Sequence, residues 1–324
     1  MHILPDAASS FAGKLDGLFV LVTVLIGIGF VAAEGLLLYS AFRFRGRPGD
    51  GRRAAFIDGA GWRQARWVLL PVTVVVGGDL YIDWRTHDVW NEVKVDLPAS
   101  DVHVRVTAQR FAWVIEYPGA DGAFDTPDDV RTMNEWHVPV GKKVAFDLRS
   151  KDVLHSLFIP ALRLKQDAVP GRTIRGWFEA TTPGDFFISC AEICGTGHSQ
   201  MSARLLVQSE ADYAAWLAGG GASPATGPLD GATVAKAKGC LACHSTDGSK
   251  SIGPSWKGLW GTDVAVVTAG AERTVKVDEA YVRTAILEAT ADVVKGYQPL
   301  MPNMKGMVSD AEVDAIIAYL KTLR

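Results

Sequence analysis

Cysteine is scarce in this sequence, with four residues among 324. Four cysteines are too few for a disulfide-dense scaffold. They stand in two close pairs, Cys190/Cys194 and Cys240/Cys243, and each pair has a histidine close behind it. The net charge is only −3, with no basic patch and no acidic tail, so the composition offers nothing for binding nucleic acid. The paired spacing favours ligand chemistry over crosslinking.

Charge is also nearly absent from two segments near the N-terminus. Leu18–Phe42 carries one charged residue, Glu34, and is long enough to cross a bilayer. Trp67–Ile82 is shorter and carries Asp79, and its flanks can extend it to a second membrane helix. A signal peptide is a rival interpretation of the first segment, but that segment is too long and no cleavage site follows it. We expect a two-helix transmembrane hairpin over residues 1–90.

The segment between these helices, RFRGRPGDGRR, is rich in arginine. Positively charged loops stay on the cytoplasmic side of a membrane. Both ends of the chain are then expected on the other side, which is the periplasmic or outer side of a bacterial inner membrane.

Residues 91–217 show the pattern of a β domain. Val102, Val104 and Val106 alternate with polar residues, as in a strand with one buried face. Further strand-like runs are EWHVPV, KKVAFDL, GWFEA, DFFIS and ARLLVQ. Short strands separated by Gly and Pro predict a sandwich or barrel, and SEADYAAWLA predicts a closing helix.

A change of composition marks the end of this domain. The stretch GGGASPATGP cannot bury enough apolar surface to pack, so residues 218–228 are expected to be a flexible linker. Residues 229–324 then favour helices. SDAEVDAIIAYLKTL begins with a capping box formed by Ser309 and Glu312.

The tail domain contains the motif CLACH, which is Cys240, Cys243 and His244 in the C-x-x-C-H spacing. Two thiols at this spacing can add to the two vinyl groups of one haem, and the adjacent histidine then reaches the iron. A redox thiol pair and half of a zinc site are the alternatives. The motif is specific enough to predict covalently bound haem c.

Such a haem needs a sixth ligand, which is commonly methionine. The stretch YQPLMPNMKGM offers Met301, Met304 and Met307. We favour Met301 because Pro302 holds the following chain extended. Met304 is the second candidate.

The stretch SCAEICGTGHSQM combines Cys190, Cys194, His198 and Met201. Structural zinc takes four Cys or His ligands and does not use a thioether. Blue copper takes a single cysteine. Two thiolates can instead bridge two soft copper ions, and a second imidazole is then needed from elsewhere. His155 in SKDVLHSLFIP can supply it.

These stretches, together with FAWVIEYPG and LKQDAVPG, resemble the CuA domain of cytochrome c oxidase subunit II, and IGPSWKGLWG in the tail resembles cytochrome c. The resemblance implies a multidomain membrane protein with two N-terminal transmembrane helices, an all-β cupredoxin barrel and an all-α cytochrome c domain. It also implies the ligands of a dinuclear copper (CuA) centre: bridging Cys190 and Cys194, with His155 and Met201 on one copper and His198 and the backbone carbonyl of Glu192 on the other.

Two further roles follow from the resemblance. The Glu192 side chain is implied as a magnesium ligand at the contact with subunit I, and carboxylate oxygen suits that ion. Trp113 stands where the family has an aromatic residue through which electrons enter. The histidines at positions 2, 87, 103 and 137 are interpreted as surface or structural residues.

A subunit II fused to a cytochrome c resembles the caa-type oxidases. The resemblance implies a subunit through which electrons pass from an outside donor, such as a cytochrome c or a bc-type complex, to the haem, the dicopper centre and subunit I. A flexible tether of this length keeps donor and acceptor at millimolar effective concentration. The eleven acidic and eleven basic residues of 229–324 argue against steering of the donor by net charge.

Two other functions stay open: a CuA-bearing subunit of a nitric oxide reductase, and a free-standing membrane-anchored electron carrier. Several positions also depart from the family pattern. Gln64 stands where relatives often have a glutamate linked to proton uptake, and Arg110 and Ala112 stand where many have aromatic residues. Glu34 and Asp79 are unusual inside membrane segments and are expected to face protein or water.

Overall fold

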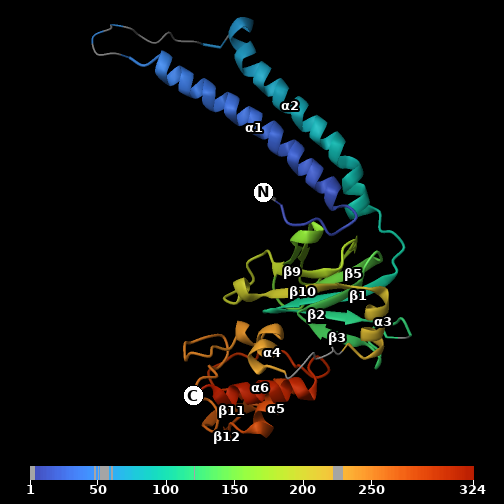
Figure 1. The fold of residues 1–324 in the computed structure, drawn as a ribbon. Helices are drawn as coiled ribbons and strands as arrows, with labels where there is room; N and C mark the ends of the chain where they lie inside the picture. Colours follow the sequence, from blue (N-terminus) through green and yellow to red (C-terminus); the bar gives the residue numbers. More distant parts are fainter. Residues whose placement is uncertain are drawn as a thin grey trace. The chain divides into compact units, whose positions relative to one another are not determined.

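The structure is a computed structural model that describes residues 4–46, 49, 51, 58–59, 61–119, 121–221 and 229–324. The chain forms two units (Figure 1). One comprises Phe11–Asp96, and the other comprises Met1–Ser10 together with Leu97–Arg324. Part of the arginine-rich segment and residues 222–228 of the predicted linker lie outside the described residues.

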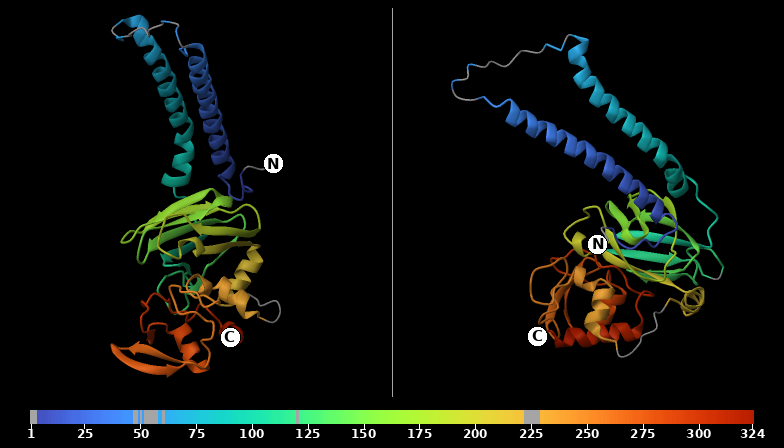
Figure 2. Two further views of the ribbon diagram at one scale, coloured as in Figure 1. Left: turned by 90° about the vertical axis from the view of Figure 1, so that its left-hand side faces the viewer. Right: turned by 45° about the horizontal axis from the view of Figure 1, so that its top comes forward.

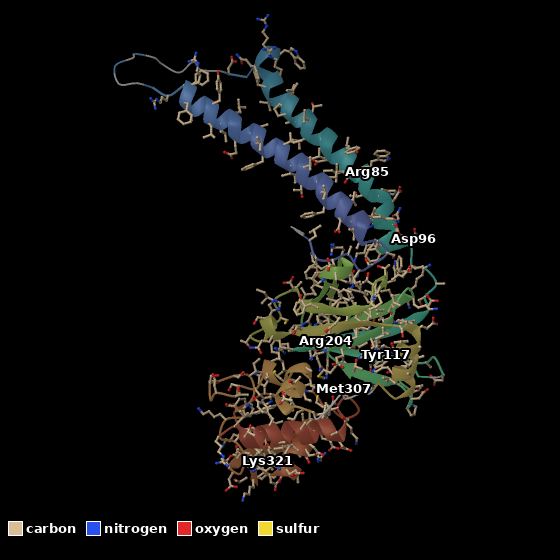
Figure 3. All side chains as sticks on the ribbon, viewed as in Figure 1. Arg85, Asp96, Tyr117, Arg204, Met307 and Lys321 are labelled. Carbon is tan, nitrogen blue, oxygen red and sulfur yellow. The ribbon has the colours of Figure 1, made fainter. Side chains whose placement is uncertain are left out.

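The first unit is a hairpin of two long helices, α1 (Ala12–Arg43) and α2 (Trp62–Trp90), and a short π-helical turn at Asn91–Val95 follows α2. By length and composition both helices can cross a membrane. Both are longer than the apolar segments that predicted them, because their polar flanks continue the helical hydrogen bonding. Figure 3 shows side chains projecting from all sides of both helices. The hairpin's two ends meet where Lys14 Nζ lies 2.8 Å from Glu92 Oε1.

The second unit begins with a β-sandwich of two five-stranded sheets. One sheet has the order β3-β2-β1-β5-β8 and the other β4-β10-β9-β6-β7. The strands are β1 (Val102–Gln109), β2 (Ala112–Tyr117), β3 (Val130–Met133), β4 (Glu135–Pro139), β5 (Lys143–Ser150), β6 (His155–Ile159), β7 (Leu164–Ala168), β8 (Ile174–Glu179), β9 (Gly184–Cys190) and β10 (Ser202–Gln208).

The core of the sandwich follows from the alternation in its strands. Val104 and Val106 are fully buried, as their spacing in β1 predicts. Large aromatic rings fill the space between the sheets: Trp136 packs edge-on against Phe146 and Phe178, with ring centroids 5.7 and 5.2 Å away. The helix α3 (Glu210–Ala218) closes the domain, as SEADYAAWLA predicts.

One part of this domain was not anticipated from the sequence. Residues preceding α1 belong to it, since Ser9 forms an isolated bridge with Ala180 and donates its hydroxyl to the Leu162 carbonyl at 2.8 Å. His137, interpreted as a surface or structural histidine, is structural: it is 2 % exposed and stacks on Trp216 of α3.

The tail of the chain is mainly helical, with α4 (Gly231–Ala237), α5 (Glu279–Leu287) and α6 (Asp310–Thr322). The predicted capping box of α6 is confirmed, with both its Ser309 and Glu312 hydrogen bonds present. The domain, expected to be all α-helical, also contains a small sheet of order β12-β11-β13. Its strands are β11 (Asp263–Thr268), β12 (Ala271–Lys276) and β13 (Val293–Val294). Figure 2 shows the fold from two further sides.

Candidate metal and haem centres

Two strand ends and the loop between them hold the cysteine-rich stretch. Cys190 is the last residue of β9, and Met201 directly precedes β10, with the Cys190 N–H donating to the Met201 carbonyl at 3.0 Å. The ladder between β6 and β9 pairs Leu157 with Cys190, so the first residue of β6, His155, lies beside the sulfur. The sheet thereby brings together residues that are 35 positions apart in the sequence.

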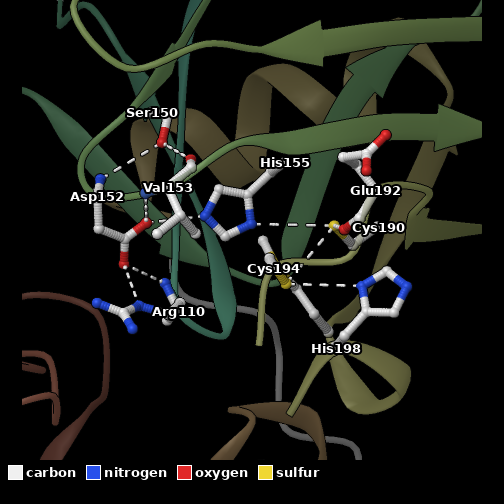
Figure 4. A network of polar contacts seen from close by, with 10 residues as sticks. Arg110, Ser150, Asp152, Val153, His155, Cys190, Glu192, Cys194 and His198 are labelled. Carbon is white, nitrogen blue, oxygen red and sulfur yellow. Dashed lines mark hydrogen bonds and ion pairs between the residues drawn. The ribbon is translucent and has the colours of Figure 1, made fainter. Parts of the chain in front are cut away.

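The side chains of this stretch converge on two sulfur atoms (Figure 4). Cys190 Sγ and Cys194 Sγ lie 3.9 Å apart. The Cys190 sulfur is 3.9 Å from His155 Nδ1 and 3.2 Å from the Glu192 carbonyl oxygen. The Cys194 sulfur is 3.6 Å from His198 Nδ1 and 3.8 Å from the Met201 sulfur. Every residue predicted from the sequence as a copper ligand is therefore part of one cluster.

The chemistry of this donor set suits copper. Thiolate, thioether and imidazole donors select soft or borderline metals, and copper binds all three kinds of donor. Zinc does not take a thioether ligand, so a zinc site would not use the Met201 sulfur. The Glu192 carboxylate points away from both sulfurs, so only its backbone carbonyl faces the cluster (Figure 4).

The two thiols differ in their electrostatics. Burial opposes ionisation of Cys190, but hydrogen bonds from His155 and from backbone N–H groups outweigh it and lower its pKa to about 6. Burial and the neighbouring Cys190 charge raise the pKa of Cys194 to about 12. Ionisation of the first thiol therefore opposes ionisation of the second, and a bound cation would favour it.

A carboxylate orients the upstream histidine. His155 Nε2 lies 2.8 Å from Asp152 Oδ1, and since a carboxylate only accepts, Nε2 carries a proton. Nδ1 faces Cys190, to which it donates without metal, and it would offer its lone pair to a bound copper. Burial opposes ionisation of Asp152, but hydrogen bonds from His155 and the Arg110 backbone outweigh it, so its pKa is lowered. Carboxylate–histidine pairs of this kind fix metal-ligating imidazoles.

The loop between the ligands is shaped by Phe111. A Cβ placed on Gly197 would lie 2.6 Å from the Phe111 ring, and one on Gly195 would lie 3.1 Å from it. The two glycines therefore allow the aromatic ring to pack directly on the ligand loop. Trp113 lies deeper: it is 1 % exposed, and its ring centroid is 6.2 Å from that of His155. The predicted role of Trp113 in electron transfer stays a prediction, and the ring that touches the loop is Phe111.

The second site is a mainly apolar pocket in the tail domain. It is lined by residues from CLACH, from IGPSWKGLWG and from α5, α6 and the segment before Met301. His244 Nδ1 is 2.7 Å from the Pro254 carbonyl, which holds the Nδ1 proton and leaves Nε2 for an iron ligand. Gly253 is required beside this ring, because a Cβ there would lie 2.7 Å from His244. An apolar pocket with a pre-oriented histidine fits a covalently attached haem.

The structure places both candidates for the sixth haem ligand beside the CLACH motif. Met301 and Met304 line one pocket together with the two cysteines and the histidine of the motif, and Met301 also lines the larger pocket described above. Met304 is 4 % exposed, and Met301 is half-buried. Met301 stays the preferred prediction because of Pro302, and Met304 stays the second candidate.

Two residues near the copper cluster were not identified as parts of it from the sequence: Phe111 and Asp152. Gly253 and Pro254 belong to IGPSWKGLWG, the stretch whose resemblance to cytochrome c implies a Gly-Pro loop against the haem. Asp152 stands three residues before a predicted ligand, and this proximity was a usable signal. Phe111 was not identified because the neighbouring Trp113 is the larger aromatic residue. Arg110 was noted as unusual, but its contact with Asp152 depends on the fold.

A β-sandwich with a two-cysteine metal cluster, followed by a helical domain with a C-x-x-C-H pocket, defines a membrane-anchored copper and haem c electron-transport protein. Comparison with known families agrees with this class. Residues 112–209 match the periplasmic domain of cytochrome c oxidase subunit II, and residues 229–324 match cytochrome c. The chain belongs to the cytochrome c oxidase subunit 2 family.

Individual relatives cover most of the chain. Cytochrome c oxidase subunit 2 of Alkalihalophilus pseudofirmus is 28 % identical over 319 residues, covering 93 % of this chain and 86 % of the relative. Alternative cytochrome c oxidase subunit 2 of Bradyrhizobium diazoefficiens is 32 % identical over 227 residues, covering 63 % of this chain and 79 % of the relative. The solved periplasmic domain of subunit II of the Bradyrhizobium japonicum cytochrome oxidase is 26 % identical, with a TM-score of 0.35, over 39 % of this chain and 96 % of that chain.

Proposed function

We propose that this chain is the subunit through which electrons enter a proton-translocating haem-copper oxidase that reduces O2 to water. When bound, a c-type haem and a dinuclear CuA centre supply two one-electron carriers between an outside donor and the catalytic subunit I. The proposed haem ligands are Cys240, Cys243, His244 and Met301. The proposed copper ligands are His155, Cys190, the Glu192 carbonyl, Cys194, His198 and Met201.

The observation that carries this proposal is the approach of the two cysteine sulfurs to 3.9 Å, with imidazole, thioether and carbonyl donors around them. Such a pair can bridge two copper ions that share one electron. The protein holds these donors in advance, since β6 and β10 are each hydrogen-bonded to β9 at the site. Because the ligand set is rigid, the positions of the ligands would change little when an electron is gained or lost.

The two domains have different tasks in this proposal. In the tail domain, the Pro254 carbonyl holds the His244 ring in position, and the apolar pocket excludes water from the haem. In the β domain, the half-buried Glu192 is available to a magnesium ion shared with subunit I. The two long apolar helices would anchor both domains beside that subunit on the outer face of the membrane.

The proposal is tested by purifying the full chain from its native membranes and determining what accompanies it. We expect a haem-copper catalytic subunit, two copper atoms and one covalent haem per copy of this chain, and O2 uptake by the complex. Uptake of nitric oxide without O2 uptake would instead support a nitric oxide reductase. A chain that purifies alone, with its metals present, would support a free-standing electron carrier.

A further inference from the structure

Arg110 is a charged side chain close to the copper cluster that the proposed ligand set does not use. It stands immediately before Phe111, and its Cδ would lie 3.7 Å from a Cβ on Gly195 in the ligand loop. Its Nε is 3.3 Å from Asp152 Oδ2, and its backbone N–H donates to the same oxygen at 2.8 Å. The guanidinium lies beside the Asp152 carboxylate and points away from the two cysteine sulfurs (Figure 4).

The two oxygens of Asp152 have separate partners. Oδ2 receives the two Arg110 donors, while Oδ1 receives the Val153 N–H at 2.7 Å and the His155 Nε2–H at 2.8 Å. The carboxylate is mostly buried, with 22 % of its side chain exposed, and Arg110 is 33 % exposed. At this degree of burial the ion pair is screened less than an exposed one.

We propose that Arg110 is a positioning residue that sets the reduction potential of the copper centre through Asp152. This inference rests on the proposed CuA function. A carboxylate that accepts a hydrogen bond from an imidazole N–H makes the ring a stronger electron donor, and a stronger donor stabilises oxidised copper. The positive charge of Arg110 offsets the negative charge of Asp152. It therefore weakens this donation and raises the potential at which the centre accepts an electron.

Three variants of the full-length, copper-loaded chain test the inference. Arg110→Gln removes the charge and keeps a polar side chain, so we expect a lower midpoint potential with the mixed-valence signal retained. Arg110→Lys keeps the charge and should hold the midpoint potential close to that of the unmodified chain. Arg204→Gln is the matched control, since it removes an ion pair with Asp185 in the same domain away from the cluster, and it should leave the potential unchanged.

A fourth measurement tests whether Arg110 acts through the carboxylate. In an Asp152→Asn background, Arg110→Gln should shift the potential by less than half as much as it does alone, as a double-mutant cycle measures. Asp152→Asn by itself should release copper about 10–100-fold more readily, as is typical when such a partner is lost. Electron paramagnetic resonance on each variant reports whether the electron is still shared between two coppers.

The outcomes that would overturn the inference are specific. An unchanged potential in Arg110→Gln, an equal shift in Arg110→Lys, or a shift that persists in full without the Asp152 carboxylate would each contradict it. Absence of the mixed-valence signal from the unmodified, copper-loaded chain is a different result, because it would contradict the proposed CuA function itself.

Discussion

At the level of single residues, the two cysteines of the copper cluster are not equivalent. The pKa of Cys190 is about 6, whereas that of Cys194 is about 12 because burial and the Cys190 charge oppose its ionisation. Cys194 also contacts both His198 and Met201. It is therefore the thiol whose ionisation depends most on the bound metal.

Replacement of Cys194 tests the bridging role. In Cys194→Ser the hydroxyl is a poor ligand for soft copper, so the electron can no longer be shared between two bridged ions. We expect loss of the mixed-valence signal in electron paramagnetic resonance and at most one copper per chain by elemental analysis. Ser199→Ala, an exposed position in the same loop, is the control. A surviving mixed-valence signal in Cys194→Ser would mean that other atoms bridge the coppers.

The glycine beside Phe111 gives a second prediction. In Gly197→Ala the new Cβ would lie 2.6 Å from the Phe111 ring, so the ring or the ligand loop must move, at a cost of about 1–3 kcal/mol. We expect a lower temperature of unfolding and a broadened copper signal. The double variant Gly197→Ala, Phe111→Leu should recover part of both losses. No recovery would show that the loop is not shaped by this ring.

At the level of secondary-structure elements, the helix caps are strong local determinants of the tail domain. Ser309 accepts the Glu312 N–H, and the Glu312 carboxylate accepts the Ser309 N–H, which completes a capping box at α6. The same helix buries Val313, Ile316 and Ile317 in the core beside the haem pocket. The cap therefore stabilises α6, which forms part of the wall of the haem pocket.

Removal of this cap should destabilise the tail domain. For Ser309→Ala we expect about 1 kcal/mol lower free energy of unfolding, measured by denaturant titration of the haem absorbance in the full chain. Ser309→Thr keeps the hydroxyl and should retain most of the stability. Equal losses in the two variants would show that the side-chain oxygen is not the source of the effect.

At the level of the whole molecule, the chain combines a membrane hairpin with two sites of different chemistry. The copper cluster and the haem pocket share none of their proposed ligands. A defect in one site should therefore leave the other one formed.

His244→Ala tests this independence. The variant lacks the imidazole that Pro254 orients, so the low-spin haem spectrum should be lost, while Cys240 and Cys243 can still attach the haem covalently. The mixed-valence copper signal should remain at full intensity in the same sample. A retained low-spin spectrum would contradict the axial role of His244, and a lost copper signal would contradict the independence of the two sites.

Most of the architecture was predictable without coordinates, because helix length and strand alternation are local properties of the chain. Both proposed ligand sets stay predictions, and the structure brings the predicted copper ligands together. The apolar runs predicted α1 and α2, and the valine alternation predicted β1. What the chain could not reveal locally were the small sheet of the tail domain and the pairing of Ser9 with Ala180, since both depend on contacts between distant segments.

The residue types and their spacing were sufficient to indicate copper and haem, because each metal prefers certain donor atoms wherever they come together. The fold alone decided which atoms come together. The pairing of β6 with β9 brings His155 to Cys190, and the folding of the tail brings Met301 and Met304 to the CLACH motif. It also joins Arg110 to Asp152, a contact that no spacing predicts because the two residues are 42 positions apart.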